Sequence, residues 1–314
     1  MLFFNSKKYA EETEKKRGKN PDPRDHSLAM MFFLGILATF PPFRIFLKLR
    51  GKRVSDLAEN QASGSDQVPI IYVHGFRGGD YTTRVMVEDA LKQKGDARFL
   101  KVEADLTGRI KLTGCYTGDK QPIIQLAFKD RIAGYQAINY YLSFILPFLS
   151  KKYVFTRYSA VSHSLGSPCV VATEMRYAKR KNFPHLASCA LIAGPFNGVM
   201  YLGDIPNVNR LTESGRPSMM TPHYSYMLRH RRDFSPSIRV LNIYGNVLDT
   251  TNSDRFISVV SAKSIRYILA PDAVYYQEVE VRGDNAEHSQ MHDEPFVIGI
   301  LNRFLGLDKI KKGL

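Results

Sequence analysis

Cysteine is scarce in this 314-residue chain, and tryptophan is absent. The three cysteines, Cys115, Cys169 and Cys189, are odd in number, and no two of them form a Cys-x-x-Cys pair. This spacing indicates neither a disulfide framework nor a zinc site. The sequence also carries no cofactor-binding motif, so we expect a chemistry that needs no metal and no cofactor.

The chain has no clear membrane-spanning run. The uncharged stretch 27–40 has 14 residues, whereas a spanning helix needs about 20. Extension to residue 49 includes Arg44 and Lys48, whose charged ends can reach the bilayer interface. Three interpretations remain open: a signal peptide, a membrane anchor or interfacial helix, and a soluble helix. We favour the first two, which predict a location at the cell membrane or outside the cell.

Positive charge is abundant and unevenly spread. The formal net charge is +14, and residues 1–55 hold twelve Lys or Arg against five acids, a net +7. Such a basic tail favours an anionic membrane surface as partner, although a solvated segment is the simpler alternative. Nucleic-acid binding is not expected, because the sequence contains no recognised motif for it.

After a polar linker over 56–67, residues 68–310 read as one catalytic domain. Apolar, β-branched runs alternate there with stretches long enough for crossover helices, which predicts an α/β fold with a mostly parallel central sheet and helices on both faces. The expected strands are 68–73, 98–103, 158–161, 187–192, 238–244 and 274–281, and 296–305 is expected to close the domain as an amphipathic helix.

Two stretches are too irregular to be simple crossovers. Residues 105–129 contain three glycines and a proline, and residues 201–236 are rich in Pro, Met, Tyr and Arg. Long irregular connections in compact domains are often functional loops. The second stretch is placed where a lid could cover an active site, and a plain surface excursion is the alternative.

Ser164 occupies the centre of a small-x-Ser-x-Gly pattern, Ser162-His163-Ser164-Leu165-Gly166. A strand precedes the pattern and an apolar run follows it, as in the nucleophile elbow of serine hydrolases. A serine on such a tight turn needs small residues two positions before and after it. Gly166 supplies one, and Ser162 stands where glycine is usual. The alternative is that Ser164 merely caps a helix.

A possible oxyanion hole follows the first strong strand, at His74-Gly75-Phe76-Arg77-Gly78-Gly79. A His-Gly pair at this place lets the backbone approach a substrate carbonyl. The expected donors are the backbone N–H groups of Phe76 and Leu165.

Acid and histidine partners should follow the last two strands. Asp254 is preferred to Asp249, because Arg255-Phe256-Ile257-Ser258 after it resembles the pattern found in many hydrolases. His288 is preferred to His292, because it is closer to the strand that ends before it. The order Ser164, Asp254, His288 is the order of α/β-hydrolases.

These residues predict a serine hydrolase that forms an acyl-enzyme on Ser164, with His288 as base and Asp254 holding the imidazole. A carboxylesterase acting on a small ester or lipid is the leading interpretation. A thioesterase or peptidase of the same fold remains open, since fold does not set substrate. So does a catalytically silent protein that binds lipid or cell-envelope material.

Several motifs resemble those of the cell-surface α/β-hydrolases of Gram-positive bacteria, a family without an assigned function. The resemblance covers about residues 66–306. It rests on IIYVHGFRGG (70–79), AVSHSLGSP (160–168), LIAGPFNG (191–198), LNIYGNVLDTTNSDRFISVVSA (241–262) and AEHSQMHDEP (286–295). It implies an α/β-hydrolase fold, carboxylesterase activity on small acyl esters, and an export signal or anchor. The family's serine, acid and histidine match Ser164, Asp254 and His288, and Arg255 replaces the family's usual glycine.

Overall fold

The computed structural model describes residues 53–130 and 134–307. Their strands form a ten-stranded sheet and a separate two-stranded ladder. The strands of the large sheet are β1 (Arg53–Asp56), β2 (Glu59–Asn60), β3 (Ile70–Val73), β4 (Leu100–Ala104), β5 (Arg109–Tyr116), β6 (Ile123–Phe128), β7 (Arg157–His163), β8 (His185–Ile192), β11 (Arg239–Asn246) and β12 (Tyr275–Arg282). The ladder pairs β9 (Val199–Met200) with β10 (Gly203–Asp204).

The large sheet is mostly parallel, as the sequence predicts. Its order is β1-β5-β4-β6-β3-β7-β8-β11-β12, with β2 beside β5, and β4 with β5 is its antiparallel pair. In the centre, Ile71 of β3 pairs with Ala160 of β7, and Val161 of β7 pairs with Ala190 of β8. These strands therefore end at one common edge, where their following loops can meet.

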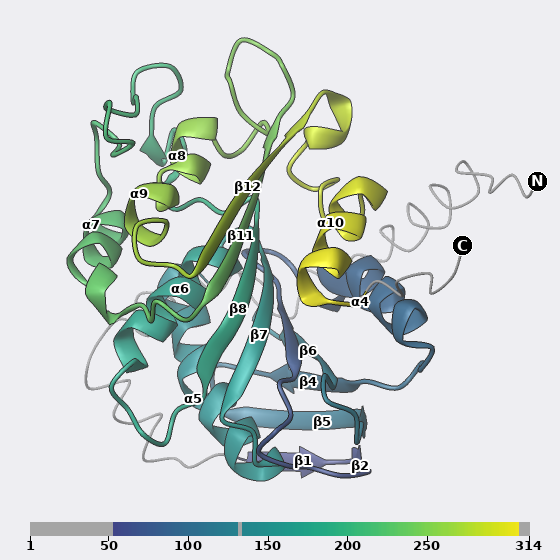
Figure 1. Cartoon of the computed structure of the whole chain (residues 1–314). Coiled ribbons are helices and arrows are strands. Elements are labelled where there is room, and N and C mark those ends of the chain that lie inside the picture. Colours follow the sequence, from purple (N-terminus) through teal and green to yellow (C-terminus); the bar gives the residue numbers. More distant parts are fainter. Residues whose placement is uncertain (1–52, 131–133, 308–314) are drawn as a thin grey trace, which may run out of the picture.

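Helices cover both faces of the sheet (Figure 1). One side carries α4 (Asp80–Lys94) and α10 (Pro295–Leu305), and the other carries α5 (Tyr135–Tyr153), α6 (Gly166–Tyr177), α7 (Pro222–Arg229), α8 (Val259–Lys263) and α9 (Ile265–Leu269). Two short 3₁₀ turns, Arg231–Asp233 and Asp284–Ala286, complete the described elements. None of the described helices is both long enough and apolar enough to span a bilayer.

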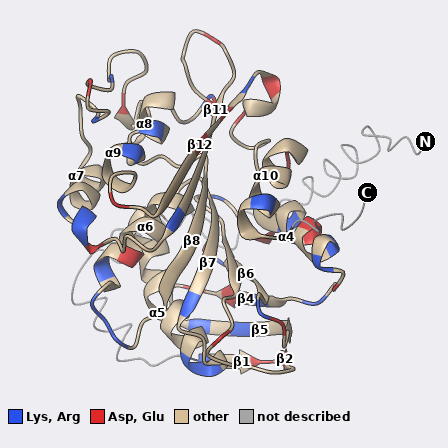
Figure 2. Ribbon diagram, viewed as in Figure 1, with Lys and Arg blue, Asp and Glu red and all other residues tan. Residues whose placement is uncertain are grey.

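The alternation of side chains along the buried strands separates two cores. Ile71 and Val73 of β3 belong to the core under α5 and α6, whereas Ile70 and Tyr72 belong to the core under α4 and α10. Both sets are buried, because successive strand residues point to opposite faces. The central strands β7, β8 and β11 consequently carry little charge, and most Lys, Arg, Asp and Glu lie on outer elements (Figure 2).

The expectation of an irregular connection over 105–129 is wrong. This stretch contains β5 and β6, and β6 lies inside the sheet with every residue buried. Gly114 interrupts the apolar pattern of β5 but is needed there, because its φ is +85° and a Cβ would lie 2.2 Å from the Phe99 carbonyl oxygen. Its role is thus a close approach between two antiparallel strands, not a chain break.

Three other predicted segments are the linker, the lid and the N-terminal apolar stretch. The expected linker, 56–67, contains β2 and the end of β1, both paired to β5 at the sheet edge. The expected lid, 201–236, contains β10 and α7, and Asn207 Nδ2 donates to the Thr250 carbonyl at 2.8 Å. Its function as a lid stays a prediction. The apolar stretch 27–49 and most of the basic tail lie outside the described residues.

Two glycines allow a matched test of this packing. A Cβ on Gly245 of β11 would lie 2.1 Å from the Ala286 carbonyl oxygen, whereas a Cβ on Gly299 of α10 meets nothing within 4 Å. We expect Gly245→Ala to lower the free energy of unfolding by about 1–3 kcal/mol or more. Gly299→Ala should raise it by about 0.5–1 kcal/mol, because alanine favours helix interiors. Urea denaturation measures both, and equal effects would contradict the packing at Gly245.

Candidate active site

Ser164 lies on a sharp turn between β7 and α6. Its φ of +54° is in the left-handed region that a non-glycine residue seldom adopts, at a cost of about 1–3 kcal/mol. Its backbone N–H donates to the Ile192 carbonyl of β8 at 2.8 Å, and its carbonyl accepts from the Ser167 N–H at 2.9 Å. These bonds hold the turn so that the side chain stands above the carboxyl edge of the sheet, partly exposed.

Small residues allow the turn to pack against the loop after β3. A Cβ on Gly75 would lie 2.8 Å from the Leu165 nitrogen, and a Cβ on Gly166 would lie 3.0 Å from the Val73 carbonyl oxygen. Ser162, which replaces the usual first glycine, is fully buried, and its hydroxyl lies 3.1 Å from Ser167 Oγ. A serine therefore fits this position with its polar atom paired.

Asp254 lies in the loop after β11 and is 1% exposed. Its Oδ1 accepts the backbone N–H groups of Phe256 at 2.9 Å and Ile257 at 2.6 Å. The turn requires Arg255 to adopt a φ of +76°, which explains why glycine is usual there. Oδ2 stays available for a third donor.

His288 bridges Asp254 and Ser164. Its Nδ1 lies 2.8 Å from Asp254 Oδ2, and its Nε2 lies 2.9 Å from Ser164 Oγ. Because a carboxylate only accepts, Nδ1 carries the proton, so Nε2 can accept the serine hydroxyl. The backbone N–H of His288 also donates to the Asp254 carbonyl at 3.0 Å. The structure thus brings together the three side chains that the sequence singles out.

The alternative acid and histidine lie elsewhere. Asp249 is exposed, and its Oδ1 accepts the backbone N–H and the hydroxyl of Thr251 at 2.8 and 2.5 Å, as in an Asx turn. These bonds lower the pKa of its carboxyl. His292 is buried, and its Nδ1 lies 2.7 Å from Asp293 Oδ1.

The two expected oxyanion donors lie on adjoining loops. Phe76 follows Gly75, whose Cβ position would touch both the Leu165 nitrogen and Ser164 Cβ. Within the described part of the chain, neither the Phe76 nor the Leu165 backbone N–H donates to another protein group. Both donors therefore remain available to a ligand next to Ser164.

Two histidines that the sequence interpretation leaves without a role support this arrangement. His74 Nδ1 donates to the Gly75 carbonyl at 3.0 Å, and its Nε2 accepts the Phe128 N–H at 2.9 Å, which ties the loop after β3 to β6. His163 Nε2 donates to the His288 carbonyl at 3.0 Å. The motifs place both histidines beside the site, but the backbone atoms of Phe128 and His288 to which they bond are far along the chain, and no sequence pattern reveals them.

Besides the Asp254 carboxylate, His288 has two uncharged rings next to it. Burial, followed by the proximity of His288 and His292, holds the pKa of His163 well below its usual range. The Phe256 ring lies 5.4 Å from the His288 ring and is about half exposed. An apolar ring therefore borders the imidazole on one side, and uncharged imidazole borders it on another.

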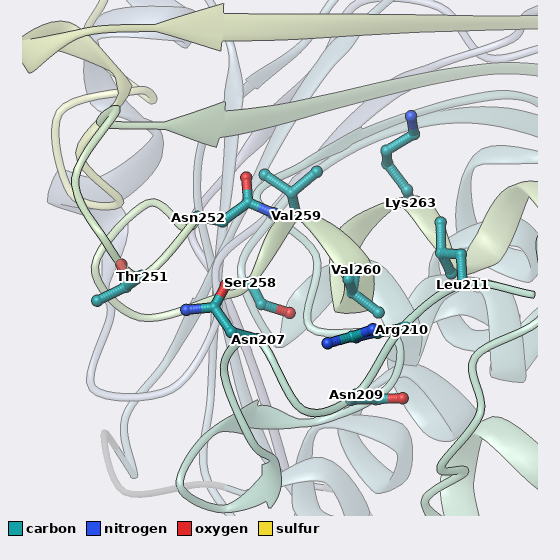
Figure 3. A pocket seen from close by; sticks show the side chains of 10 residues that line it. All are labelled: Asn207, Asn209, Arg210, Leu211, Thr251, Asn252, Ser258, Val259, Val260 and Lys263. Carbon is teal, nitrogen blue, oxygen red and sulfur yellow. The ribbon is translucent and has the colours of Figure 1, made fainter.

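A separate cavity of about 440 Å³ lies between residues 207–211 and residues 251–263. Its lining includes Asn207, Arg210 and Ser258, while Lys263 extends away from the other polar side chains (Figure 3). Neither Ser164 nor His288 lines it. Among residues 53–130 and 134–307, no group of three or more His, Cys, Asp or Glu side chains could hold a metal ion.

Comparison with known proteins places the chain in a family. Residues 58–307 match the family described as alpha/beta hydrolase of unknown function (DUF915). The chain belongs to this family. The resemblance to cell-surface α/β-hydrolases drawn from the motifs is thereby confirmed, as is the α/β-hydrolase fold.

Solved structures agree with the DUF915 fold. A gene product from Listeria innocua is 26% identical with a TM-score of 0.70, and the match covers 79% of this chain and 96% of that one. A proposed cell surface hydrolase from Lactobacillus plantarum WCFS1 is 21% identical with a TM-score of 0.64, over 78% and 94% of the two chains. No curated protein matches the chain.

The two candidate acids of this DUF915 hydrolase should differ in their effect on stability. Asp254→Ala leaves the buried Ile257 N–H and the partly buried Phe256 N–H without their acceptor, and we expect the free energy of unfolding to fall by about 1–3 kcal/mol. Asp249→Ala removes only the exposed hydrogen bonds from Thr251 to Asp249 Oδ1, and it should leave the urea midpoint close to that of the unmodified protein. The reverse ranking in urea denaturation would contradict the assignment of Asp254 to the buried site.

Proposed function

We propose that this protein is a serine carboxylesterase that works through an acyl-enzyme on Ser164. One observation supports the proposal most strongly: a continuous line of hydrogen bonds from Asp254 Oδ2 through the imidazole of His288 to Ser164 Oγ. This is the arrangement by which serine hydrolases activate a hydroxyl. The hydrolase class follows from the family, and the ester specificity is our inference.

In the acylation step, Ser164 Oγ attacks the ester carbonyl carbon while its proton moves to His288 Nε2. Asp254 keeps the Nδ1 proton in place and stabilises the imidazolium that forms. The carbonyl oxygen becomes negative and accepts the N–H groups of Phe76 and Leu165, each contributing on the order of 3 kcal/mol. The C–O bond to the alcohol then breaks, and Nε2 gives its proton to the departing alkoxide.

Deacylation uses the same residues, with water as the nucleophile and Ser164 Oγ as the leaving group. A water molecule enters where the alcohol left. His288 Nε2 takes a proton from this water while the water oxygen attacks the acyl carbon. The bond to Ser164 Oγ breaks, and the proton returns from Nε2 to the serine. The carboxylic acid leaves, and no metal or cofactor takes part in this sequence.

The surroundings of Ser164 favour an uncharged, apolar ester. Phe256 borders His288 with about half of its surface exposed, and the side chain of Phe76 is 46% exposed. Apolar substrate groups gain free energy by covering such rings. We therefore propose an ester with an apolar acyl or alcohol part as the substrate.

We also propose that the protein works at the cell surface. The name of the Lactobacillus plantarum protein supports this location, and so does the apolar stretch 27–49 with its basic flanks. An anionic membrane remains the proposed partner of the basic tail.

The nucleophile assignment is tested by Ser164→Ala. Without its hydroxyl the protein cannot form the acyl-enzyme, so hydrolysis of short-chain nitrophenyl esters should fall about a thousandfold or more. Circular dichroism and urea denaturation should show an intact fold. A loss of less than tenfold would argue against Ser164 as the nucleophile.

The two histidines provide a matched pair for the base. His288→Ala should reduce the rate by about a thousandfold, because among the residues that the structure describes only His288 bonds to Ser164 Oγ as an acceptor. His292→Ala should retain at least about a tenth of the activity, because His292 bonds to Asp293 and not to the serine. The same nitrophenyl ester assay ranks them, and a greater loss in His292→Ala would contradict the proposed base.

A further inference from the structure

His163 is a buried histidine that precedes the proposed nucleophile and bonds to the main chain of the proposed base. It precedes Ser164 directly at the end of β7 and is 4% exposed. The His163 side chain is thus shielded from solvent, and the proposed esterase reaction steps do not use it. Burial of an imidazole costs free energy unless its polar atoms are paired.

The ring pairs with the backbone of the histidine loop. His163 Nε2 donates to the His288 carbonyl at 3.0 Å, so Nε2 must carry the proton. The backbone N–H of His288 in turn donates to the Asp254 carbonyl at 3.0 Å. His288 is therefore held through its main chain both by the serine turn and by the acid loop.

Ring contacts support this hydrogen bond. The His163 ring centroid lies 4.9 Å from that of His288 and 4.9 Å from that of His292. The first pair is tilted by 48°, and the second is perpendicular at 89°. His163 thus packs against the His288 imidazole and restricts the orientations that this ring can adopt.

We infer that His163 is a positioning residue, whose Nε2–H and ring hold His288 in line with Ser164 Oγ. This inference rests on the proposed function and adds a fourth side chain to it. His163 touches no reacting atom, so it acts only through the place and angle of the His288 imidazole. A shift of about 1 Å at a reacting group can cost on the order of a hundredfold in rate.

Four variants of the full chain separate the hydrogen bond from simple packing. His163→Phe keeps an aromatic ring and removes the donor. His163→Gln places an amide N–H near the position of Nε2, whereas the shorter His163→Asn cannot reach the His288 carbonyl. His292→Phe is the matched control, since it replaces a neighbouring buried ring that does not bond to that carbonyl.

We expect kcat for a nitrophenyl ester to fall about 10- to 100-fold in His163→Phe, with KM within about threefold of the unmodified value. His163→Gln should recover kcat to within about fivefold, and His163→Asn should be at least tenfold slower than His163→Gln. His292→Phe should stay within about threefold. Urea denaturation identifies any variant that fails to fold. If His163→Phe does not fold, the ratio of kcat between His163→Gln and His163→Asn tests the hydrogen bond by itself.

Labelling with a fluorophosphonate distinguishes failure of the esterase proposal from failure of the positioning role of His163. If the unmodified protein is not labelled at Ser164, the esterase proposal fails. If it is labelled, and folded His163→Phe is labelled at the same rate, or Gln and Asn are equally slow, then the positioning role of His163 is overturned and the esterase proposal stands.

Discussion

The hydrogen bond between Ser164 Oγ and His288 Nε2 joins loops that are 124 residues apart in the sequence. It depends on the parallel register of β7, β8, β11 and β12, which brings their carboxyl ends to one edge of the sheet. Each candidate residue follows one of these strands, so no loop has to be long to reach the others. The proposed chemistry therefore depends on the strand order, which brings the loops together, and on the loop conformations, which orient the side chains.

Strained backbone conformations in two of these loops orient the side chains of the site. Ser164 and Arg255 both adopt left-handed conformations, at φ of +54° and +76°, and each turn aims or supports a side chain of the site. The cost is offset by backbone hydrogen bonds, such as Ser164 N–H to Ile192 and the two N–H groups bound by Asp254 Oδ1. His163 contributes a further link, because its side chain connects the serine turn to the histidine loop.

Sequence patterns predicted the centre of the fold better than its edge. The buried strands β3, β7, β8 and β11 follow apolar runs, whereas β5 is missed because exposed Arg109, exposed Lys111 and Gly114 obscure the pattern of a half-buried strand. β6 is a continuous apolar run, but it lies inside a stretch that glycines and a proline make irregular. Strand pairings at the sheet edge, such as β1 with β5, depend on tertiary contact, which local composition does not encode.

In the candidate site, the sequence predicts the three central side chains but not the residues that support them. Motif order singled out Ser164, Asp254 and His288, and the structure brings these three together. The supporting bonds of His74 and His163 end on backbone atoms of Phe128 and His288, which are far along the chain. A side chain whose partner is a carbonyl or an amide leaves no residue type to recognise, so only the folded chain reveals it.

An oxygen that becomes negative next to Ser164 must accept the backbone N–H groups of both Phe76 and Leu165 for the proposed chemistry to work. A crystal structure of the protein after reaction with a fluorophosphonate ester measures this directly, because the tetrahedral phosphorus resembles the acylation intermediate. We predict phosphorus bonded to Ser164 Oγ, with its phosphoryl oxygen about 2.7–3.1 Å from the nitrogens of both Phe76 and Leu165. An adduct on another residue, or an oxygen directed away from these nitrogens, would contradict the account.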